Sequence, residues 1–317
     1  MRISPDPPLP WLAERELGKS AELDRLYDGY TPPFELEPPE EPPKRRRWLV
    51  WLGRFTTAIF TALLAICIFV GSHIWYTPSS TAFMDQNPNK PLVYEWVDLD
   101  HISRYALSAA IAHEDPDFGK RVGAFNVSSF IGTAESYMGG QSDVVGGSTI
   151  PQQLVKNMYL NPDRSAWRKA AEAALSTPYA LILPDKRILE LYMNYAQFGP
   201  SLYGICAASW FYFDTPPWSM TPYEAAQLAS ILPLPSLARR ADGGGIYVIG
   251  PNSNAKFMFE VYTKTPNDTA YLGGYQAIMQ RVGIDDESSD HAHDGDRACS
   301  AMPAGVVNLL DEQGAPS

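Results

Sequence analysis

The sequence has little cysteine, no excess of positive charge and no metal-binding spacing. Its 317 residues include three cysteines and carry a formal net charge of -11. This acidic balance argues against a nucleic-acid partner, which would need a basic face. Cys67 lies in an apolar run, and the distant Cys206 and Cys299 form neither a redox pair nor a zinc motif. A Cys206–Cys299 disulfide would need an oxidising compartment, and we do not expect it because Cys299 lies in a polar tail.

Residues 1–47 also lack periodic apolar positions and are rich in proline and acidic residues. Such a composition cannot bury a core, because too little apolar surface is present to offset the lost chain entropy. We therefore predict a disordered, proline-rich tail for this segment.

The run from Phe55 to Tyr76 contains no charged residue and is long enough to cross a bilayer. Four basic residues, 44–47, precede it, whereas residues 77–80 are uncharged. The positive-inside rule then predicts a cytoplasmic N-terminus and the rest of the chain outside. A cleaved signal peptide is the competing interpretation, and it fits less well because the run starts far from the N-terminus and is too long.

The pattern becomes globular near residue 90. The apolar spacing from Ser103 to His113 predicts a buried helix, and Pro116 ends it by disfavouring helical backbone at the preceding residue. Glu114 therefore ends a largely apolar helix, where a partly desolvated carboxylate is suited to general acid or base work. A helix-terminal carboxylate in water is the alternative, which these residues alone leave open.

Polar side chains of the stretch 146–157 have the spacing of a ligand-binding helix start. Thr149 and Gln152 match a capping box, and Gln153 and Lys156 share a helical face. A helix that opens after glycines and carries amides and a lysine can hold an anionic ligand. An ordinary capped helix with a solvated polar face remains the alternative.

A second cluster of charge follows. Arg168 and Glu172 are four residues apart on one helical stripe, with Lys169 beside them. These residues form either a solvated face with ion pairs or, together with Lys156, a phosphate clamp. Helices are predicted at 163–175, 185–194, 206–213 and 221–231. The segment from 90 to 235 is thus mainly helical.

Five motifs occur in the order and spacing of a known family. They are Glu114-Asp115 with Phe118 and Gly123, Gly147-Ser-Thr-Ile-x-Gln-Gln-Leu-x-Lys-Asn157, Arg168-Lys-x-x-Glu172, Lys186-x-x-Ile-Leu-Glu-x-Tyr-Met-Asn194, and Gln197-Phe-Gly199 through Tyr212-Phe213. With these motifs, the chain resembles the peptidoglycan glycosyltransferases of glycosyltransferase family 51, and most of all the monofunctional biosynthetic transglycosylases. The resemblance covers roughly residues 90–240.

This resemblance implies a mainly α, lysozyme-like helical glycosyltransferase domain behind a single N-terminal transmembrane helix. It implies polymerisation of lipid II into β-1,4 glycan strands, with inversion and release of undecaprenyl diphosphate. The implied partners are lipid II, the growing glycan strand, membrane lipid and other cell-wall synthesis proteins. No cofactor is expected, although a divalent cation is left open. The implied location is the cytoplasmic (inner) membrane, with the catalytic domain in the periplasm.

The resemblance also assigns roles to residues. Glu114 becomes the general base that takes the proton of the acceptor sugar's 4-hydroxyl, and Glu172 is a second catalytic acid that orients cations, assists the leaving group or touches a divalent ion. The expected substrate-binding residues are Ser148, Thr149, Gln152, Gln153, Lys156, Asn157, Arg168 and Lys169. The three cations among them would hold the diphosphate. No metal site is expected, since His291 and His293 stand without further ligands in an acidic stretch.

Two departures from the family pattern, together with the unusual tails at the two ends of the chain, favour a second hypothesis. Arg121 stands where the family usually has a histidine, and Pro151 stands where it usually has a threonine. The alternative is a catalytically weak or inactive homologue that acts as an interaction partner in wall synthesis. A lysozyme-like hydrolase would share the fold. Glycan cleavage, however, offers no diphosphate for the cations to hold.

The expected domain boundaries follow from these features. They are 1–47 for a cytoplasmic disordered tail, 48–77 for the anchor, 82–240 for the glycosyltransferase domain, 241–284 for a segment that closes it, and 285–317 for an acidic disordered tail. Within the domain we predict a long loop at 119–147 with one short helix at 127–131. We expect no penicillin-binding transpeptidase domain, because the residues after 240 lack a Ser-x-x-Lys motif.

Overall fold

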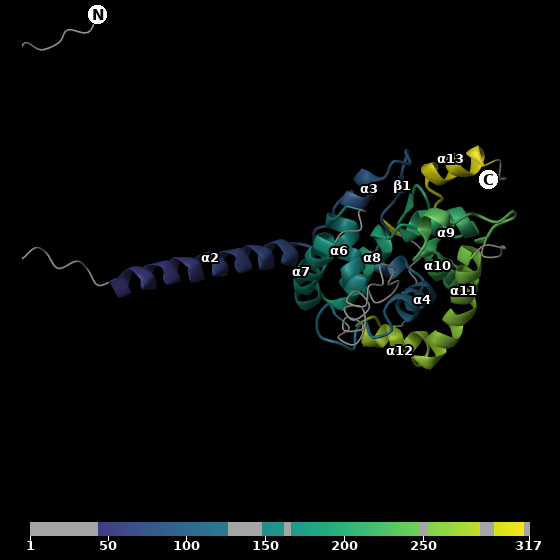
Figure 1. Cartoon of the computed structure of the whole chain (residues 1–317). Helices are drawn as coiled ribbons and strands as arrows, with labels where there is room; N and C mark the ends of the chain where they lie inside the picture. Colours follow the sequence, from purple (N-terminus) through teal and green to yellow (C-terminus); the bar gives the residue numbers. More distant parts are fainter. Residues whose placement is uncertain (1–43, 126–147, 162–165, 248–252, 286–294, 314–317) are drawn as a thin grey trace, which may run out of the picture. The chain divides into compact units, whose positions relative to one another are not determined.

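The computed structural model describes residues 44–125, 148–161, 166–247, 253–285 and 295–313. These parts of the chain are mainly helical and lysozyme-like, as predicted (Figure 1). The chain divides into two units, residues 1–59 and 60–317, which are treated separately below. The predicted loop at 119–147 and its short helix fall mostly outside the described residues.

The predicted anchor is confirmed as a helix by α2 (Lys44–Ser72). Its segment Trp48–Ser72 is long and apolar enough to cross a membrane. Within this segment, large apolar side chains such as Phe55 and Phe60 are exposed on the surface of the helix. Such a surface suits a lipid environment and supports membrane anchoring.

The last turns of α2 belong to the larger unit and pack on it. The His73 imidazole Nε2 lies 2.9 Å from the Tyr159 hydroxyl, and the Phe69 ring lies 5.8 Å from the Tyr159 ring. Val70 is buried in the core. The end of the anchor is therefore fixed on the helical domain through aromatic and polar contacts.

The remaining elements follow in chain order (Figure 1). The helices are α3 (Ala82–Gln86), α4 (Arg104–Glu114), α6 (Ile150–Tyr159), α7 (Ala166–Ile182), α8 (Asp185–Tyr195), α9 (Ile205–Phe213), α10 (Pro222–Ile231), α11 (Ser253–Tyr271), α12 (Gly274–Arg281) and α13 (Ala304–Glu312). Short 3-10 turns occupy Leu99–His101, Pro217–Ser219 and Pro235–Leu237. Two short strands, β1 (Val93–Tyr94) and β2 (Leu202–Tyr203), pair in parallel.

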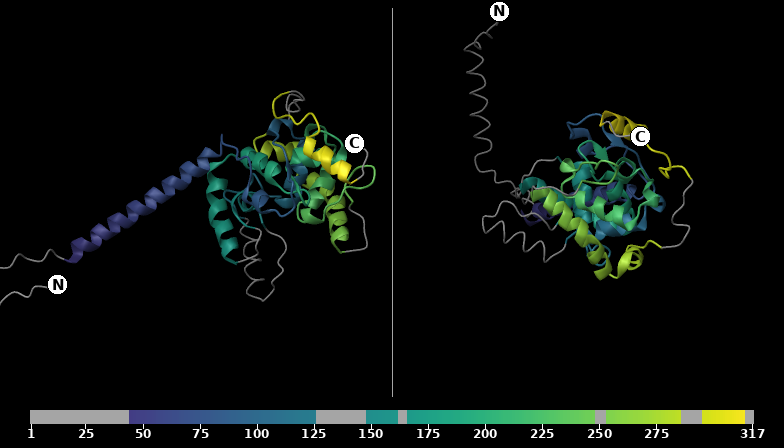
Figure 2. Two further views of the ribbon diagram at one scale, coloured as in Figure 1. Left: turned by 90° about the horizontal axis from the view of Figure 1, so that it is seen from above. Right: turned by 90° about the vertical axis from the view of Figure 1, so that its right-hand side faces the viewer.

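Helix α4 is the central element of the helical domain. It is contacted by α10, α11 and α12, and Figure 2 shows these helices gathered around it. Its alanines favour helix and allow close packing, and Leu107 and Ile111 are fully buried. At its start, the Ser103 hydroxyl donates to the Met220 carbonyl at 2.7 Å, which ties α4 to the segment before α10. The catalytic candidate Glu114 is thus carried by a rigid, buried helix.

Helix α8 positions the chain that leads into α4. The Asn194 amide accepts a hydrogen bond from the Val97 N–H at 2.9 Å and donates one to the Val97 carbonyl at 2.8 Å. Glu190 accepts from the Leu99 N–H at 2.9 Å. Both family-motif side chains therefore bind backbone, which is a scaffold role.

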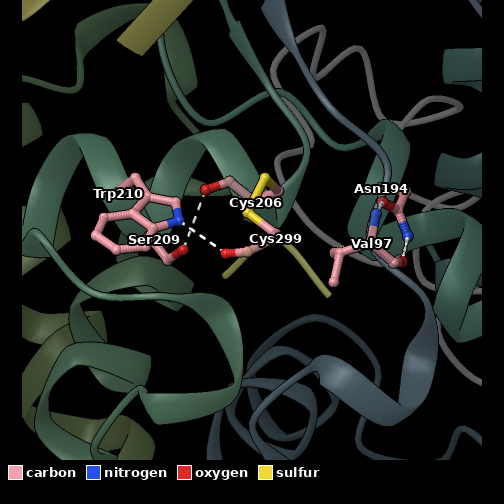
Figure 3. The surroundings of a disulfide bond; sticks show 6 residues. All are labelled: Val97, Asn194, Cys206, Ser209, Trp210 and Cys299. Atoms are coloured by element: carbon pink, nitrogen blue, oxygen red, sulfur yellow. Dashed lines mark hydrogen bonds between the residues drawn. A yellow bond between two sulfur atoms is a disulfide. The ribbon is translucent and has the colours of Figure 1, made fainter. Parts of the chain in front are cut away.

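The expectation that Cys206 and Cys299 stay unpaired is wrong. The two cysteines form a disulfide across 93 residues of sequence (Figure 3). Cys299 is buried, and its carbonyl accepts a hydrogen bond from the Trp210 indole N–H at 2.9 Å. The polar composition around Cys299 suggested an exposed tail. Burial of this one segment against α9 overrides that local signal.

The prediction of a disordered tail over 285–317 also needs correction. Helix α13 forms at Ala304–Glu312, and Val306 and Leu310 are fully buried. It contacts α9 and β1, beside which Figure 1 shows it. The apolar residues of α13 have the spacing of a helix face, but the acidic residues earlier in the segment led to the prediction of disorder. Helices α11 and α12 lie within 241–284, the segment expected to close the domain.

Candidate active site

Glu114 is the last residue of α4, and its side chain is only 10% exposed. The Gln153 amide of α6 donates to Glu114 Oε2 at 2.5 Å. The Tyr192 hydroxyl of α8 in turn donates to Gln153 Oε1 at 3.2 Å. These two hydrogen bonds fix the orientation of the Gln153 amide, so that its N–H faces the Glu114 carboxylate.

Tyr192 is suited to this role because it stays neutral. Burial raises the pKa of its phenol well above the usual value, and the nearby carboxylates of Glu114 and Asp115 raise it further. A neutral phenol keeps its proton and therefore remains a donor to Gln153. Three helices, α4, α6 and α8, thus cooperate in placing one carboxylate.

Asp115 connects α4 to the start of α6. It is buried, and its Oδ2 accepts a hydrogen bond from the Ile150 N–H at 2.9 Å. Arg121 binds both oxygens of the same carboxylate at 2.5 Å each. A carboxylate at a helix N-terminus satisfies a free N–H and interacts favourably with the helix dipole. Arg121, unusual for the family, therefore has a defined partner here.

The predicted capping box at the start of α6 is confirmed. The Thr149 N–H donates to Gln152 Oε1 at 3.1 Å, and the Thr149 hydroxyl donates to the Ala124 carbonyl at 2.6 Å. Pro151 lies in the first turn of the helix, where a backbone N–H has no intrahelical partner to lose. The second departure from the family pattern thus suits its helix position.

Glu172 lies at the centre of a charged cluster on α7. It is 2% exposed and accepts from Arg168 Nη1 at 3.2 Å and from the Lys169 ammonium. Lys169 also donates to the Ser148 hydroxyl at 2.8 Å, which links α7 to the start of α6. Among the residues that the structure describes, the cluster holds two cations against one carboxylate.

Lys156 adds a third cation to this region. Its ammonium lies 5.5 Å from the centre of the Phe83 ring. Burial lowers the pKa of Lys156, while the carboxylates of Glu172 and Glu114 oppose this shift. A bound anion would act in the same direction as these carboxylates and would favour the charged ammonium. The region is therefore electrostatically prepared for an anionic group.

The structure brings most of the predicted site residues together, although they have two kinds of surroundings. Glu114 and Gln153 form one contact, and Ser148, Arg168, Lys169 and Glu172 form another. Thr149, Gln152 and Asn157 are buried and form hydrogen bonds within the protein; Asn157 donates to the Tyr195 carbonyl at 3.4 Å. Their expected contact with substrate stays a prediction.

Sequence reasoning assigned no site role to His113, Tyr192 and Phe83. Tyr192 was visible as part of the Tyr-Met-Asn motif and as a neighbour of buried helix positions. His113 is adjacent to Glu114 in sequence, and its Nε2 lies 3.4 Å from Glu114 Oε1. Phe83 approaches Lys156 from α3, and no sequence signal connects the two residues.

In the described part of the chain, no three His, Cys, Asp or Glu side chains gather as a metal site would require. His291 and His293, the pair that prompted a metal interpretation, lie outside the described residues.

Comparison with known proteins matches residues 82–244 to the family model described as transglycosylase. A biosynthetic peptidoglycan transglycosylase of Laribacter hongkongensis is 33% identical over 199 residues, 59% of this chain and 87% of the relative. The protein of that name in Alcanivorax borkumensis is 37% identical over 189 residues, which cover 56% of this chain and 76% of the relative. The protein of that name in Azoarcus sp. is 35% identical over 205 residues, which cover 61% of this chain and 88% of the relative.

Proposed function

This chain belongs to the transglycosylase family, and we propose that it polymerises lipid II into glycan strands with Glu114 as the general base. The enzyme is a peptidoglycan glycosyltransferase of cell-wall biosynthesis. The observation that carries the proposal is that one domain holds two carboxylates with different neighbours. Glu114 is bound by a neutral amide, and Glu172 is bound by two cations. Lys156 interacts electrostatically with both carboxylates.

In the proposed reaction, Glu114 removes the proton from the 4-hydroxyl of the acceptor sugar. The oxygen attacks the anomeric carbon of the donor chain, the bond to the diphosphate breaks, and the configuration inverts. Gln153 holds Glu114 Oε2 at 2.5 Å, which orients the carboxylate toward its substrate. The proton remains on Glu114 until it is released to solvent.

Lys156, Arg168 and Lys169 stabilise the charge that develops on the leaving diphosphate. Charge-assisted hydrogen bonds to phosphate are among the strong ones, and fixed cations need no reorganisation during the reaction. Glu172 holds Arg168 and Lys169 in place and offsets part of their mutual repulsion. We assign it a positioning role for the clamp. Ser148, bound to Lys169, lies at the edge of this site.

The alternative of a weak or inactive homologue was motivated by Arg121, Pro151 and the two unusual tails of the chain. Arg121 binds Asp115, and Pro151 occupies a helix position that tolerates proline, so neither side chain disrupts the candidate site. A glycan hydrolase would leave three clustered cations without a diphosphate to bind. Both alternatives are therefore less well supported than the polymerase.

The direct test is a lipid II polymerisation assay with full-length protein in detergent. The wild type should form glycan and release undecaprenyl diphosphate. Glu114→Gln should lose about 10²–10⁴-fold in rate, which is the usual contribution of a general base. Glu260→Gln, a change at an exposed glutamate of α11, serves as the control and should retain activity. Equal rates for the wild type and Glu114→Gln would exclude Glu114 as the base.

We further propose an inner-membrane protein with its N-terminus in the cytoplasm and its catalytic domain in the periplasm. The basic flank at 44–47 supports this orientation. The Cys206–Cys299 disulfide supports it independently, because disulfides persist in oxidising compartments and are rare in the cytosol.

Thiol labelling of protein denatured directly from cells tests the orientation. A maleimide carrying a polymer tag should add one tag, at Cys67, and three tags after reduction. The Cys206→Ser variant should take two tags without reduction, because Cys299 loses its partner. Three tags on the unreduced wild type would contradict a periplasmic catalytic domain.

A further inference from the structure

One oxygen of Glu114 lies against a histidine that the reaction described above does not use. Glu114 Oε1 is buried and has no hydrogen-bond partner among the described residues. The His113 Nε2 atom lies 3.4 Å from it, just beyond an ordinary hydrogen bond. The other oxygen, Oε2, is held by Gln153. The two oxygens therefore have different neighbours, an amide that always donates and an imidazole that donates according to its protonation and tautomer.

His113 is enclosed by a part of the chain beyond residues 82–244, the segment that matches the family model. Helix α11 packs on α4 and places Lys264 and Asp268 near the imidazole. These two side chains pair with each other at 3.6 Å. The side chain of His113 is 20% exposed, so protons exchange with solvent.

Burial lowers the pKa of His113, and Lys264 lowers it as well, whereas Glu114 and Asp268 act in the opposite direction. The imidazole is consequently neutral near pH 7. From the other helices near the carboxylate, α6 contributes Gln153 and Lys156, and α8 contributes Tyr192.

The charge of His113 matters because a general base works through its free lone pair. A neutral imidazole leaves Oε1 without a counter-charge, and the carboxylate keeps its affinity for a proton. An imidazolium 3.4 Å away would stabilise the carboxylate by direct Coulomb attraction and would weaken it as a base. A small side-chain movement would also close the gap to a charge-assisted hydrogen bond.

We propose that His113 is a positioning residue for Glu114. The neutral imidazole leaves the carboxylate free to act as a base, and the protonated imidazole pairs with Oε1. This inference rests on the proposed role of Glu114. It predicts that protonation of His113 contributes to the acidic limb of the pH–rate profile. Elongation would then slow as the imidazole takes up a proton.

The test compares kcat at pH 7.5 and pH 5.5 in the lipid II polymerisation assay, for the wild type, His113→Gln and His113→Leu. The ratio of the two rates within one protein cancels any difference in the folded fraction. The wild type should fall about tenfold for each pH unit below its midpoint, and both variants should start to fall at lower pH. Identical pH profiles, or an equal loss at both pH values, would overturn the proposal.

A second measurement follows the His113 imidazole directly by NMR in the full-length protein, with the His113→Gln spectrum assigning its signal among the five histidines. Glu114→Gln should lower the His113 midpoint, because the carboxylate stabilises the imidazolium. An unchanged midpoint would overturn the coupling.

Glu114→Gln also separates this proposal from the proposed function. If that variant polymerises at the wild-type rate, the base assignment fails. If it is inactive while His113→Gln has the wild-type pH profile, the failure belongs to His113 alone.

Discussion

Glu114 and Glu172 are both nearly buried, yet their surroundings differ in charge. Glu114 ends α4 and is contacted by the Gln153 amide and the His113 imidazole. Glu172 lies on α7 and is paired with Arg168 and Lys169. A carboxylate contacted by neutral groups has no cation bound to its oxygens and can serve as a proton acceptor. A carboxylate between two cations is engaged in charge-assisted hydrogen bonds that hold those cations in place. The same side chain is thus suited to proton transfer in one place and to holding cations in the other.

Lys156 belongs to the region around Glu172, but both carboxylates act on it electrostatically. The carboxylate of Glu172 acts on it more strongly than that of Glu114. Its burial makes the ammonium costly in the free enzyme, and a bound diphosphate would offset that cost. The comparison therefore predicts that changes around Glu172 alter substrate affinity and stability, and that changes around Glu114 alter turnover.

After Glu114→Gln, the largest effect is expected for Lys156→Met, which removes a partly buried cation and keeps an apolar stem. The loss of a charge-assisted contact of about 1.5–3 kcal/mol should raise the KM for lipid II by about 10–100-fold. The free energy of unfolding should hold or rise, because a desolvated charge is removed. Steady-state kinetics and urea unfolding check both statements. Lys156→Arg is the matched control that keeps the charge, and an unchanged KM for Lys156→Met would remove Lys156 from the clamp.

A smaller effect is expected on the stability of Glu172→Gln. This change leaves Arg168 and Lys169 without their carboxylate. Breaking a fully buried pair costs about 3–5 kcal/mol, but Lys169 is 41% exposed, so we expect a loss of about 2 kcal/mol. Urea unfolding measures it, with Glu114→Gln as the control that lacks a paired cation and should lose less. Equal losses would mean that the two carboxylates do not differ in their support of the fold.

The smallest effect concerns stability and pH at His113. The folded pKa lies below the unfolded value of 6.5, so the unfolded chain takes up the proton first as the pH falls. This group therefore lowers stability on acidification, fully so below its folded pKa, and has no such effect above pH 6.5. His113→Gln should lose less stability than the wild type between pH 7.5 and 5.5 in urea unfolding. A greater loss in the variant would contradict the assigned direction.

The local parts of this architecture could be predicted from the sequence. The capping box at Thr149, the buried helix that ends at Glu114 and the apolar anchor all depend on residues close together in the chain. The pairing of Lys169 with Glu172 follows from helical spacing in the same way.

Contacts between distant segments could not be predicted. The Cys206–Cys299 disulfide and the packing of helix α13 on α9 and β1 bring together residues that are far apart in sequence, and no local pattern specifies these contacts. The surroundings of His113 depend on Asp268, which is brought in by α11 from far along the chain. The candidate site was therefore foreseeable in its charged residues and not in the neighbours that tune them.

The most direct test of the division between the two carboxylates measures lipid II affinity and turnover together in Glu114→Gln and Glu172→Gln. Fluorescent lipid II in detergent micelles gives the Kd, and the polymerisation assay gives kcat. We expect Glu114→Gln to keep the wild-type Kd and lose turnover, and Glu172→Gln to bind more weakly while retaining measurable turnover. Wild-type turnover in Glu114→Gln, combined with complete loss of turnover at an unchanged Kd in Glu172→Gln, would contradict the account.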